Sequence, residues 1–274
     1  MPDDRGMTTS DGLLQLRGTT LGAGVPKVCV PVVASTVEAA VAAVAALPPG
    51  VAEVVELRLD HLTGAARDTA VVRDAVAAVR GALPAEVPLL ATFRSAREGG
   101  AQPADEDAYT AVVRASLAPF PADGAGGGGA GEGADVVDVE LAARDAAALV
   151  RAAHAAGTPV VVSQHDFAAT PPADDLVAVL RHQRDLGADV CKVAVTPHDA
   201  DDVLTLLTAT RRFAREADRP LVTIAMGGLG VVTRVAGEVF GSAMTFGAVG
   251  ATSAPGQVDA VRLRAAMGLL HDAL

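Results

Sequence analysis

Lys192 lies in the middle of an apolar run, Val190–Val195, where a basic residue is unusual. A lysine that is shielded from water and placed near other cations loses its charge easily, and a neutral amine attacks ketones to form an imine. Arginine does not deprotonate and is excluded from this chemistry. Of the 22 basic residues only Lys27 and Lys192 are lysines, and Lys27 opens an earlier run with no chemical role that we can assign. The alternative interpretation of Lys192 is a side chain whose ammonium group reaches water at a strand end.

A histidine stands at the end of the preceding apolar run. The run Pro159–Ser163 is followed by Gln164 and His165. Taken alone, His165 could be a histidine whose hydrogen bonds are satisfied within the core. It lies one strand before Lys192, however, at the matching strand end. A group that gains and loses protons near neutral pH, beside an imine-forming amine, predicts a general acid/base.

Charged side chains also end three earlier apolar runs. Glu56, Arg58 and Asp60 alternate with leucines, so the period of two of a β-strand places all three on one face. Charges on a strand face cost free energy unless they are paired or used. The pattern therefore indicates either an ion-pair network or a site for a polar substrate. It recurs in two later runs, the first with Arg94 and then Glu98, the second with Asp138 and Glu140.

Glycine-rich loops follow the last two strand-like runs. Met226–Gly230 precedes Arg234, and Ser253 to Gln257 follows a run that ends at Gly247. Such loops commonly bind phosphate through backbone N–H groups. Here Arg234, Ser253 and Gln257 add side-chain donors, and arginine binds carboxylates through two parallel hydrogen bonds. The set indicates a site for a carboxylate that has hydroxyl groups beside it.

Strand-like and helix-like segments alternate along the chain, which is typical of a parallel sheet covered on both faces. Eight such units predict an α/β fold, a (β/α)₈ TIM barrel, and Leu13–Leu21 is expected to form a short hairpin that closes the barrel bottom. A doubly wound open sheet is the alternative, but no G-x-G-x-x-G motif follows the first strand. The expected strands are Lys27–Val33, Glu53–Leu59, Leu89–Phe93, Asp135–Glu140, Pro159–Ser163, Asp189–Val195, Leu221–Ala225 and Ala243–Gly247. The expected helices are Thr36–Ala46, Arg67–Gly81, Asp105–Leu117, Ala142–Ala155, Ala173–Leu186, Ala200–Ala217, Gly230–Val239 and Val258–Leu270.

Composition limits the possible classes of protein. We expect residues 1–11 to be a disordered tail and residues 12–274 to be one catalytic domain, with a flexible Gly- and Ala-rich loop at 119–133. The 22 basic residues stand against 33 acidic ones, a net charge of −11, which argues against a nucleic-acid partner. No apolar run could span a membrane and no signal-peptide pattern opens the chain, so we expect a cytoplasmic protein. Cys29 and Cys191 predict neither a disulfide framework nor a metal site.

The polar segments together resemble those of type I 3-dehydroquinate dehydratase, the imine-forming class of the shikimate pathway. The resemblance runs from Val25 to the C-terminus in family order. It implies a (β/α)₈ fold, a homodimer and dehydration of 3-dehydroquinate to 3-dehydroshikimate. The implied reaction uses a covalent imine on the enzyme and needs neither a cofactor nor a metal. The matching segments are ELRLDHL at 56–62, TFRSAREGG at 92–100, DVEL at 138–141, SQHDF at 163–167, KVAVTPHDADDVLTLL at 192–207 and GVVTRVAGEVFGSAMTFGAVGATSAPGQ at 230–257.

The resemblance also implies a role for each matching residue. Lys192 falls at the imine-forming lysine, His165 at the general acid/base, and Glu98 at the carboxylate beside that histidine. The positions that bind substrate are matched by Glu56, Arg58, Arg94, Arg234, Ser253 and Gln257. Three positions depart from the pattern of many relatives, which have serine there, so water or backbone groups are expected to replace some hydroxyl contacts. These positions are Pro31, Ala225 and Gly227.

Two other functions are compatible with parts of the pattern. A class I aldolase would share the lysine, but it usually binds a phosphate, whereas Arg234 with Ser253 and Gln257 favours a polyhydroxy carboxylate. A non-catalytic sensor of sugar acids would retain the binding residues and lose the lysine or the histidine, yet Lys192 and His165 are both present. Both residues support what the resemblance implies, a hydro-lyase that forms a Schiff base.

Overall fold

The computed structural model describes residues 12–117, 133–250 and 253–274. The tail expected at 1–11, and all of the loop expected at 119–133 except Gly133, lie outside the described residues. Within the described residues, no helix is long and apolar enough to cross a membrane.

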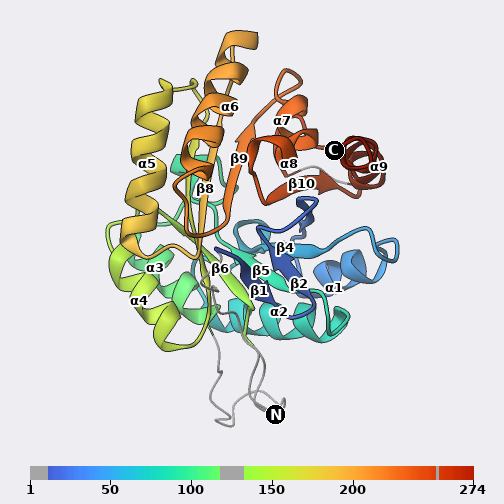
Figure 1. The fold of residues 1–274 in the computed structure, drawn as a ribbon. Coiled ribbons are helices and arrows are strands. Elements are labelled where there is room, and N and C mark those ends of the chain that lie inside the picture. Colours follow the sequence, from blue (N-terminus) through green and yellow to red (C-terminus); the bar gives the residue numbers. More distant parts are fainter. Residues whose placement is uncertain (1–11, 118–132, 251–252) are drawn as a thin grey trace.

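Across the described ranges, eight parallel strands curl into a barrel (Figure 1). Its two edge strands, β9 and β10, meet where the backbone N–H of Ala243 donates to the carbonyl of Leu221 at 2.8 Å. A two-residue strand, β11 (Val258–Asp259), adds to β10 from outside the ring. The barrel strands are β3 (Lys27–Val32), β4 (Val54–Arg58), β5 (Leu89–Thr92), β6 (Val136–Glu140), β7 (Val160–Asp166), β8 (Val190–Val195), β9 (Leu221–Ala225) and β10 (Met244–Ala248). The predicted TIM barrel is confirmed, and the open-sheet alternative is wrong.

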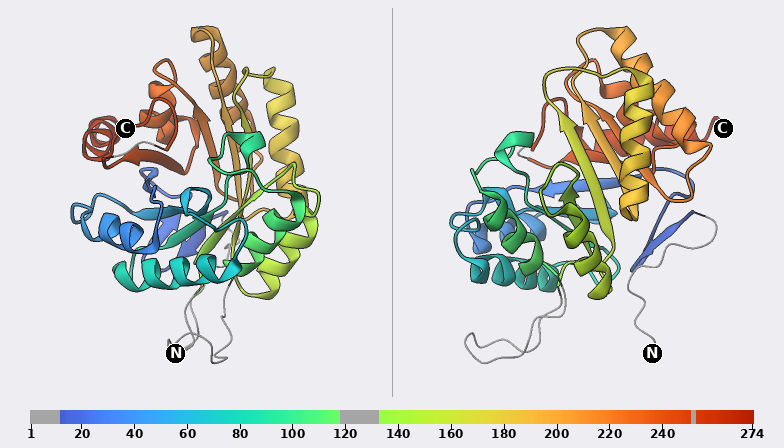
Figure 2. Two further views of the ribbon diagram at one scale, coloured as in Figure 1. Left: turned by 180° about the vertical axis from the view of Figure 1, so that it is seen from behind. Right: turned by 90° about the vertical axis from the view of Figure 1, so that its left-hand side faces the viewer.

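Helices follow the strands and cover the outside of the barrel (Figures 1 and 2). They are α1 (Val37–Ala45), α2 (Thr69–Ala82), α3 (Glu106–Ala115), α4 (Ala146–Ala155), α5 (Ala173–Leu186), α6 (Ala200–Ala214), α7 (Val231–Val235), α8 (Gly237–Phe240) and α9 (Ala260–His271). The single helix expected at Gly230–Val239 is instead the pair α7 and α8. The break falls at Ala236, whose ψ of 16° leaves the helical range, beside Gly237, which packs closely on Pro26 and Ser242.

The alternation of the strands separates two apolar regions. Outward-facing residues such as Val55, Val162 and Val193 pack against the helices in the larger core. Inward-facing residues at the start of each strand, such as Val54 and Val190, fill the lower interior of the barrel. Charged residues follow these apolar ones on the same inner face, so the period of two directs them into the upper part of the barrel.

The N-terminal hairpin closes the lower interior, as the sequence predicts. Strands β1 (Leu14–Leu16) and β2 (Thr19–Leu21) pair antiparallel. Leu14, Leu16 and Leu21 are buried among the inward-facing residues at the bottom of the barrel. The hairpin therefore completes the apolar layer below the polar one.

Removing one hairpin leucine should destabilise the whole barrel. We expect Leu16→Ala to lower the free energy of unfolding by about 2–5 kcal/mol, because it leaves a cavity between the hairpin and the barrel strands. Urea denaturation followed by circular dichroism measures the change. The matched control is Leu269→Ala on α9, whose side chain is 75% exposed and should contribute almost nothing. Equal effects of the two substitutions would show that the hairpin is not part of the core.

Candidate active site

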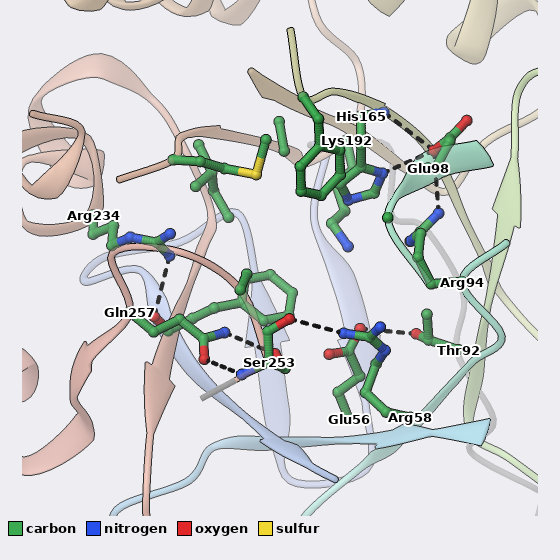
Figure 3. A pocket seen from close by; sticks show the side chains of 17 residues that line it. Glu56, Arg58, Thr92, Arg94, Glu98, His165, Lys192, Arg234, Ser253 and Gln257 are labelled. Atoms are coloured by element: carbon green, nitrogen blue, oxygen red, sulfur yellow. Dashed lines mark hydrogen bonds and ion pairs between the residues drawn. The ribbon is translucent and has the colours of Figure 1, made fainter. Parts of the chain in front are cut away.

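A pocket opens at the carboxyl ends of the barrel strands, where the active site of a TIM barrel lies. All nine residues that the sequence predicts for the site line this pocket (Figure 3): Glu56, Arg58, Arg94, Glu98, His165, Lys192, Arg234, Ser253 and Gln257. Figure 3 shows Arg234, Ser253 and Gln257 on one side of the cavity, and Lys192 and His165 on the other.

Lys192 is an inward-facing residue of β8. Its neighbours Cys191 and Val193 pack outward against the helices. Its side chain is 5% exposed, with Nζ 3.4 Å from Oδ2 of Asp138 and 4.8 Å from the centre of the Phe246 ring. The side chain therefore points into the barrel and does not extend past the strand end into bulk solvent. The amine lies at the base of the pocket, enclosed by a carboxylate and an aromatic face.

His165 lies inside β7, which continues to Asp166 instead of ending at Ser163 as expected. In the register of the sheet His165 is opposite Ala194, two residues beyond Lys192. Side chains two residues apart share a strand face, so the imidazole and the amine project into the same cavity. The structure thus brings together the two residues that the sequence singles out.

Glu98 forms a close pair with His165. It ends the short helix η2 (Ala96–Glu98), and Gly99, with φ of 82°, turns the chain immediately after it. Oε2 of Glu98 accepts the backbone N–H of His165 at 3.1 Å and lies 2.9 Å from Nδ1 of the ring. An oxygen that already accepts one N–H favours the tautomer that donates from Nδ1. The other ring nitrogen, Nε2, is then left to exchange protons with a ligand.

The pair is buried, and burial shifts both of its pKa values. Burial raises the pKa of Glu98 to about 8, although Arg94 opposes the shift. Burial, together with Arg94 and Lys192, lowers the pKa of His165 well below its ordinary value. Near neutral pH the favoured state is thus a neutral imidazole beside a protonated carboxyl. Because Nδ1 of His165 and Oε2 of Glu98 are only 2.9 Å apart, the two groups titrate as a unit. The sequence predicts a histidine with a pKa near neutral, but burial moves the pKa of His165 below that range.

Arg94 connects this pair to the barrel wall. Its Nη1 donates to Glu98 at 3.3 Å, to Glu140 at 3.0 Å and to the hydroxyl of Ser163 at 3.0 Å. Its Nη2 donates to Asp138 at 2.9 Å. Burial alone would lower the pKa of Arg94, but the three carboxylates outweigh it and raise the pKa. Arg94 therefore orders the acidic groups around it as well as lining the pocket.

A second buried ion pair fixes Arg58 at the end of β4. Asp60 accepts from Nε and Nη2 of Arg58, both at 2.8 Å. Nη1 of the same guanidinium donates to the carbonyl of Ser253 at 3.3 Å, which joins β4 to the loop after β10. Beside it, Oε1 of Glu56 accepts from the hydroxyl of Thr92 at 2.9 Å. Donors and acceptors for ligand hydroxyls thus lie next to each other.

Arg234 differs from the other arginines of the pocket. It is 1% exposed, and no carboxylate within residues 12–117, 133–250 and 253–274 forms an ion pair with it. Its Nη groups donate only to the carbonyls of Phe246 and Pro255, both at 3.3 Å, and its Nε has no partner within the described chain. Burial lowers the pKa of Arg234 to about 10, so it remains charged at neutral pH. A buried cation without a counter-ion favours binding of an anion.

Ser253 and Gln257 form the loop wall beside Arg234. Gln257 donates to the hydroxyl of Ser253 at 2.9 Å, and its Oε1 accepts the backbone N–H of Ser253 at 2.8 Å. Gly256 lies against the backbone of Gly227, where a Cβ atom would come within 2.3 Å of the Gly227 carbonyl oxygen. The loop after β10 is thereby held against the loop after β9.

The three departures from the family pattern have different surroundings. Ala225 faces outward into the helix-covered core, so a hydroxyl at this position would not reach the pocket. Gly227 donates its backbone N–H to Pro255 at 3.2 Å and has φ of 74°, which favours glycine. Pro31 is buried in β3 opposite Glu56. Pro31 therefore lies beside a residue that lines the pocket.

Two residues that support the site were not among those predicted for it. Asp138 contacts Lys192 from below the pocket, and Asp60 orients Arg58. Their alternation with apolar residues in the sequence was the available signal, because it places both on the inner faces of their strands. In the part of the chain that the structure describes, no cluster of three or more His, Cys, Asp or Glu side chains could hold a metal ion.

The raised pKa of Glu98 should make stability fall with increasing pH. Between the ordinary pKa of a carboxyl, 4.5, and about 8, the folded protein holds a proton that the unfolded chain has lost. The lowered pKa of His165 acts in the opposite direction only below about 6.5. From about pH 6.5 to 8 we therefore expect the free energy of unfolding to fall by roughly 1–2 kcal/mol. Urea denaturation at several pH values measures this, with Glu98→Gln as the comparison. A slope that Glu98→Gln leaves unchanged would assign the effect to another group.

The sequence matches the family model described as type I 3-dehydroquinase over residues 28–273. Among curated proteins it is similar to 3-dehydroquinate dehydratase of Klebsiella pneumoniae (strain 342), with 43% identity over 258 residues, which cover 93% of this chain and 97% of that protein. The 3-dehydroquinate dehydratase of Listeria monocytogenes serovar 1/2a has the same identity and coverage.

Solved structures with a similar fold come from the same family as the sequence matches. The fold is similar to type I 3-dehydroquinate dehydratase from Clostridium difficile with covalently modified comenic acid, with a TM-score of 0.85 and 33% identity over 96% of this chain and 99% of that one. For 3-dehydroquinate dehydratase from Enterococcus faecalis the TM-score is 0.82 and the identity 35%, over 93% and 98% of the two chains. This chain belongs to the type I 3-dehydroquinase family.

Proposed function

We propose that this protein dehydrates 3-dehydroquinate to 3-dehydroshikimate, a step of the shikimate pathway, through an imine on Lys192. The observation that carries the proposal is a buried amine beside the His165–Glu98 pair. It faces, across one pocket, an arginine that has no ion-pair partner among the described residues. Family membership and the names of the similar proteins support the same reaction.

The pocket offers a partner for each polar part of this substrate. Arg234, with Ser253 and Gln257, binds the carboxylate and the hydroxyl on the same carbon, C1. Glu56 and Arg58 bind the ring hydroxyls, with Arg94 behind them. The C3 ketone then lies toward Lys192, because the carboxylate anchor is on the opposite side of the cavity (Figure 3). Fixing both ends of the ring places the reacting carbon near the amine.

The reaction proceeds through two cationic imines. The amine of Lys192 adds to C3 and water leaves, which gives a protonated imine. His165 removes a proton from C2, and the electrons of the C–H bond neutralise the imine nitrogen to form an enamine. The enamine expels the C1 hydroxyl, which leaves as water with the proton from His165, and the conjugated imine forms. Hydrolysis releases the enone and restores Lys192.

In this mechanism Glu98 orients the imidazole and adjusts its proton affinity. The electron sink is the imine itself, so the proposed steps require no cofactor and no metal. We also propose that the protein acts as a cytoplasmic homodimer on this small-molecule substrate, with residues 12–274 as its single catalytic domain.

Trapping the imine tests the proposal directly. Borohydride added during turnover of 3-dehydroquinate should reduce the imine and leave a covalent adduct on Lys192, which peptide mass mapping locates. Lys192→Ala should lose turnover and the adduct together, because no other lysine lines the pocket within the described chain. An adduct on another residue, or turnover by Lys192→Ala, would refute the mechanism.

His165→Ala separates imine formation from proton transfer. We expect the variant to form the borohydride-trapped adduct but to lose turnover by at least about 100-fold, since general acid/base groups contribute about 10²–10⁴ in rate. Near-normal turnover would show that another group moves the C2 proton. His198→Ala, at an exposed position after β8, is the matched control and should retain activity.

Arg234 should control binding more than chemistry. Arg234→Gln removes the unpaired cation, so we expect KM for 3-dehydroquinate to rise by about 10–100-fold, which corresponds to the loss of a charge-assisted hydrogen bond worth about 1.5–3 kcal/mol. Steady-state kinetics measure the change, and Arg211→Gln on α6 is the control. A normal KM in Arg234→Gln would place the substrate carboxylate elsewhere.

A further inference from the structure

Asp138 is a buried carboxylate whose two oxygens have different partners. Oδ1 accepts from the hydroxyl of Ser163 at 2.7 Å and from Nη2 of Arg94 at 2.9 Å. Oδ2 faces Nζ of Lys192 at 3.4 Å. Asp138 faces the barrel interior from β6, and its side chain is fully buried. One oxygen is therefore fixed by the protein framework, while the other is directed at the reacting nitrogen.

The overall conversion of a lysine ammonium group into a protonated imine conserves one positive charge on this nitrogen, although the amine attacks in its neutral form. An ammonium group and a ketone combine to give a protonated imine and one water molecule, and a single positive charge is conserved. The three hydrogens of the ammonium group become two in water and one on the imine nitrogen. A fixed carboxylate beside Nζ thus compensates the cation in both states. After imine formation, it also accepts the one remaining N–H.

We propose that Asp138 is a catalytic residue, the fixed counter-ion that keeps the imine nitrogen of Lys192 protonated. The proposal rests on the function proposed above and adds a fourth group to Lys192, His165 and Glu98. A protonated imine withdraws electrons from C2 far better than a neutral one, so a counter-ion that retains this proton keeps the intermediate reactive.

Asp138 does not act as a base in this role. Burial alone would raise its pKa, but Arg94 and Lys192 outweigh burial and hold the pKa of Asp138 below its ordinary value. The carboxylate is therefore ionised when it faces the amine of Lys192. Proton transfer remains with His165, and Asp138 supplies a constant negative charge.

The pH dependence of imine trapping distinguishes a counter-ion from a structural residue. Cyanoborohydride reduces only the protonated imine, so the trapping rate with saturating 3-dehydroquinate falls as the imine loses its proton. For Asp138→Asn, which retains the shape of the side chain, we expect the pH midpoint of this fall to move down by about 1–3 units, as for loss of a nearby opposite charge. We expect kcat to fall on the order of 100-fold.

Ser163→Ala is the matched control. It removes one hydrogen bond of the same carboxylate and leaves its charge, so we expect the trapping midpoint to remain at the wild-type value. An unchanged midpoint in Asp138→Asn would overturn the proposal. Equal displacement in Ser163→Ala would also overturn it, because the effect would then come from the geometry of the network.

A charge-retaining variant covers the case in which Asp138→Asn does not fold. Asp138→Glu should retain the wild-type trapping midpoint even if kcat falls, since its charge remains beside Nζ. A midpoint displaced toward acid in Asp138→Glu would contradict the proposal.

The wild-type protein separates this inference from the proposed function. Normal trapping on Lys192 in the wild type, with an unshifted Asp138→Asn, refutes only the role of Asp138, whereas no trapping in the wild type refutes the function itself.

Discussion

The buried guanidinium of Arg94 holds together the acidic groups on which the rest of the site depends. It bonds Glu98, Asp138, Glu140 and Ser163, which come from the short helix η2 and from the neighbouring strands β6 and β7. Three carboxylates this close would repel one another if no cation lay between them. One arginine does not neutralise all three, and the balance is met by Lys192 and by the proton that Glu98 retains up to a pKa of about 8. The carboxylate of Asp138 beside Lys192 makes this side of the pocket suited to a reaction with cationic intermediates.

Those intermediates move the positive charge between two places that the network has prepared. In the proposed reaction the charge lies first on the imine nitrogen beside Asp138, then on the imidazole beside Glu98 after the C2 proton is taken. It returns to the nitrogen when the C1 hydroxyl leaves with that proton. Because Arg94 bonds both carboxylates, the two positions are held at a fixed separation and little rearrangement is needed as the charge moves.

Much of this arrangement follows from the sequence, because two regularities of strands determine it. Alternation places Glu56, Arg58, His165 and Lys192 on inner faces, and parallel strands bring their carboxyl ends to one rim. The partners of these residues depend on something else, the register between neighbouring strands. Ser163 is opposite Lys192, whereas Asp138 is opposite Val161, and only this offset brings the Asp138 carboxylate to the amine. No local pattern encodes register between strands that are distant in sequence. The pKa values of His165 and Glu98 also cannot be predicted from the sequence, because they depend on how deeply the pair is buried.

Arg94 and Arg234 show what burial adds to residue type. Both are arginines in a barrel lined with polar groups, and the family resemblance gives both to substrate binding. Arg94 has three carboxylates around it, while Arg234 is as deeply buried and has only backbone carbonyls. Desolvating a cation without a counter-ion costs several kcal/mol, and the folded protein bears this cost until an anion arrives. A ligand carboxylate at Arg234 would recover that free energy, whereas an anion at Arg94 would have to displace Glu98, Asp138 or Glu140. The difference directs the carboxylate end of the substrate to one side of the pocket and leaves the acidic side for the ketone and for the cations that form from it.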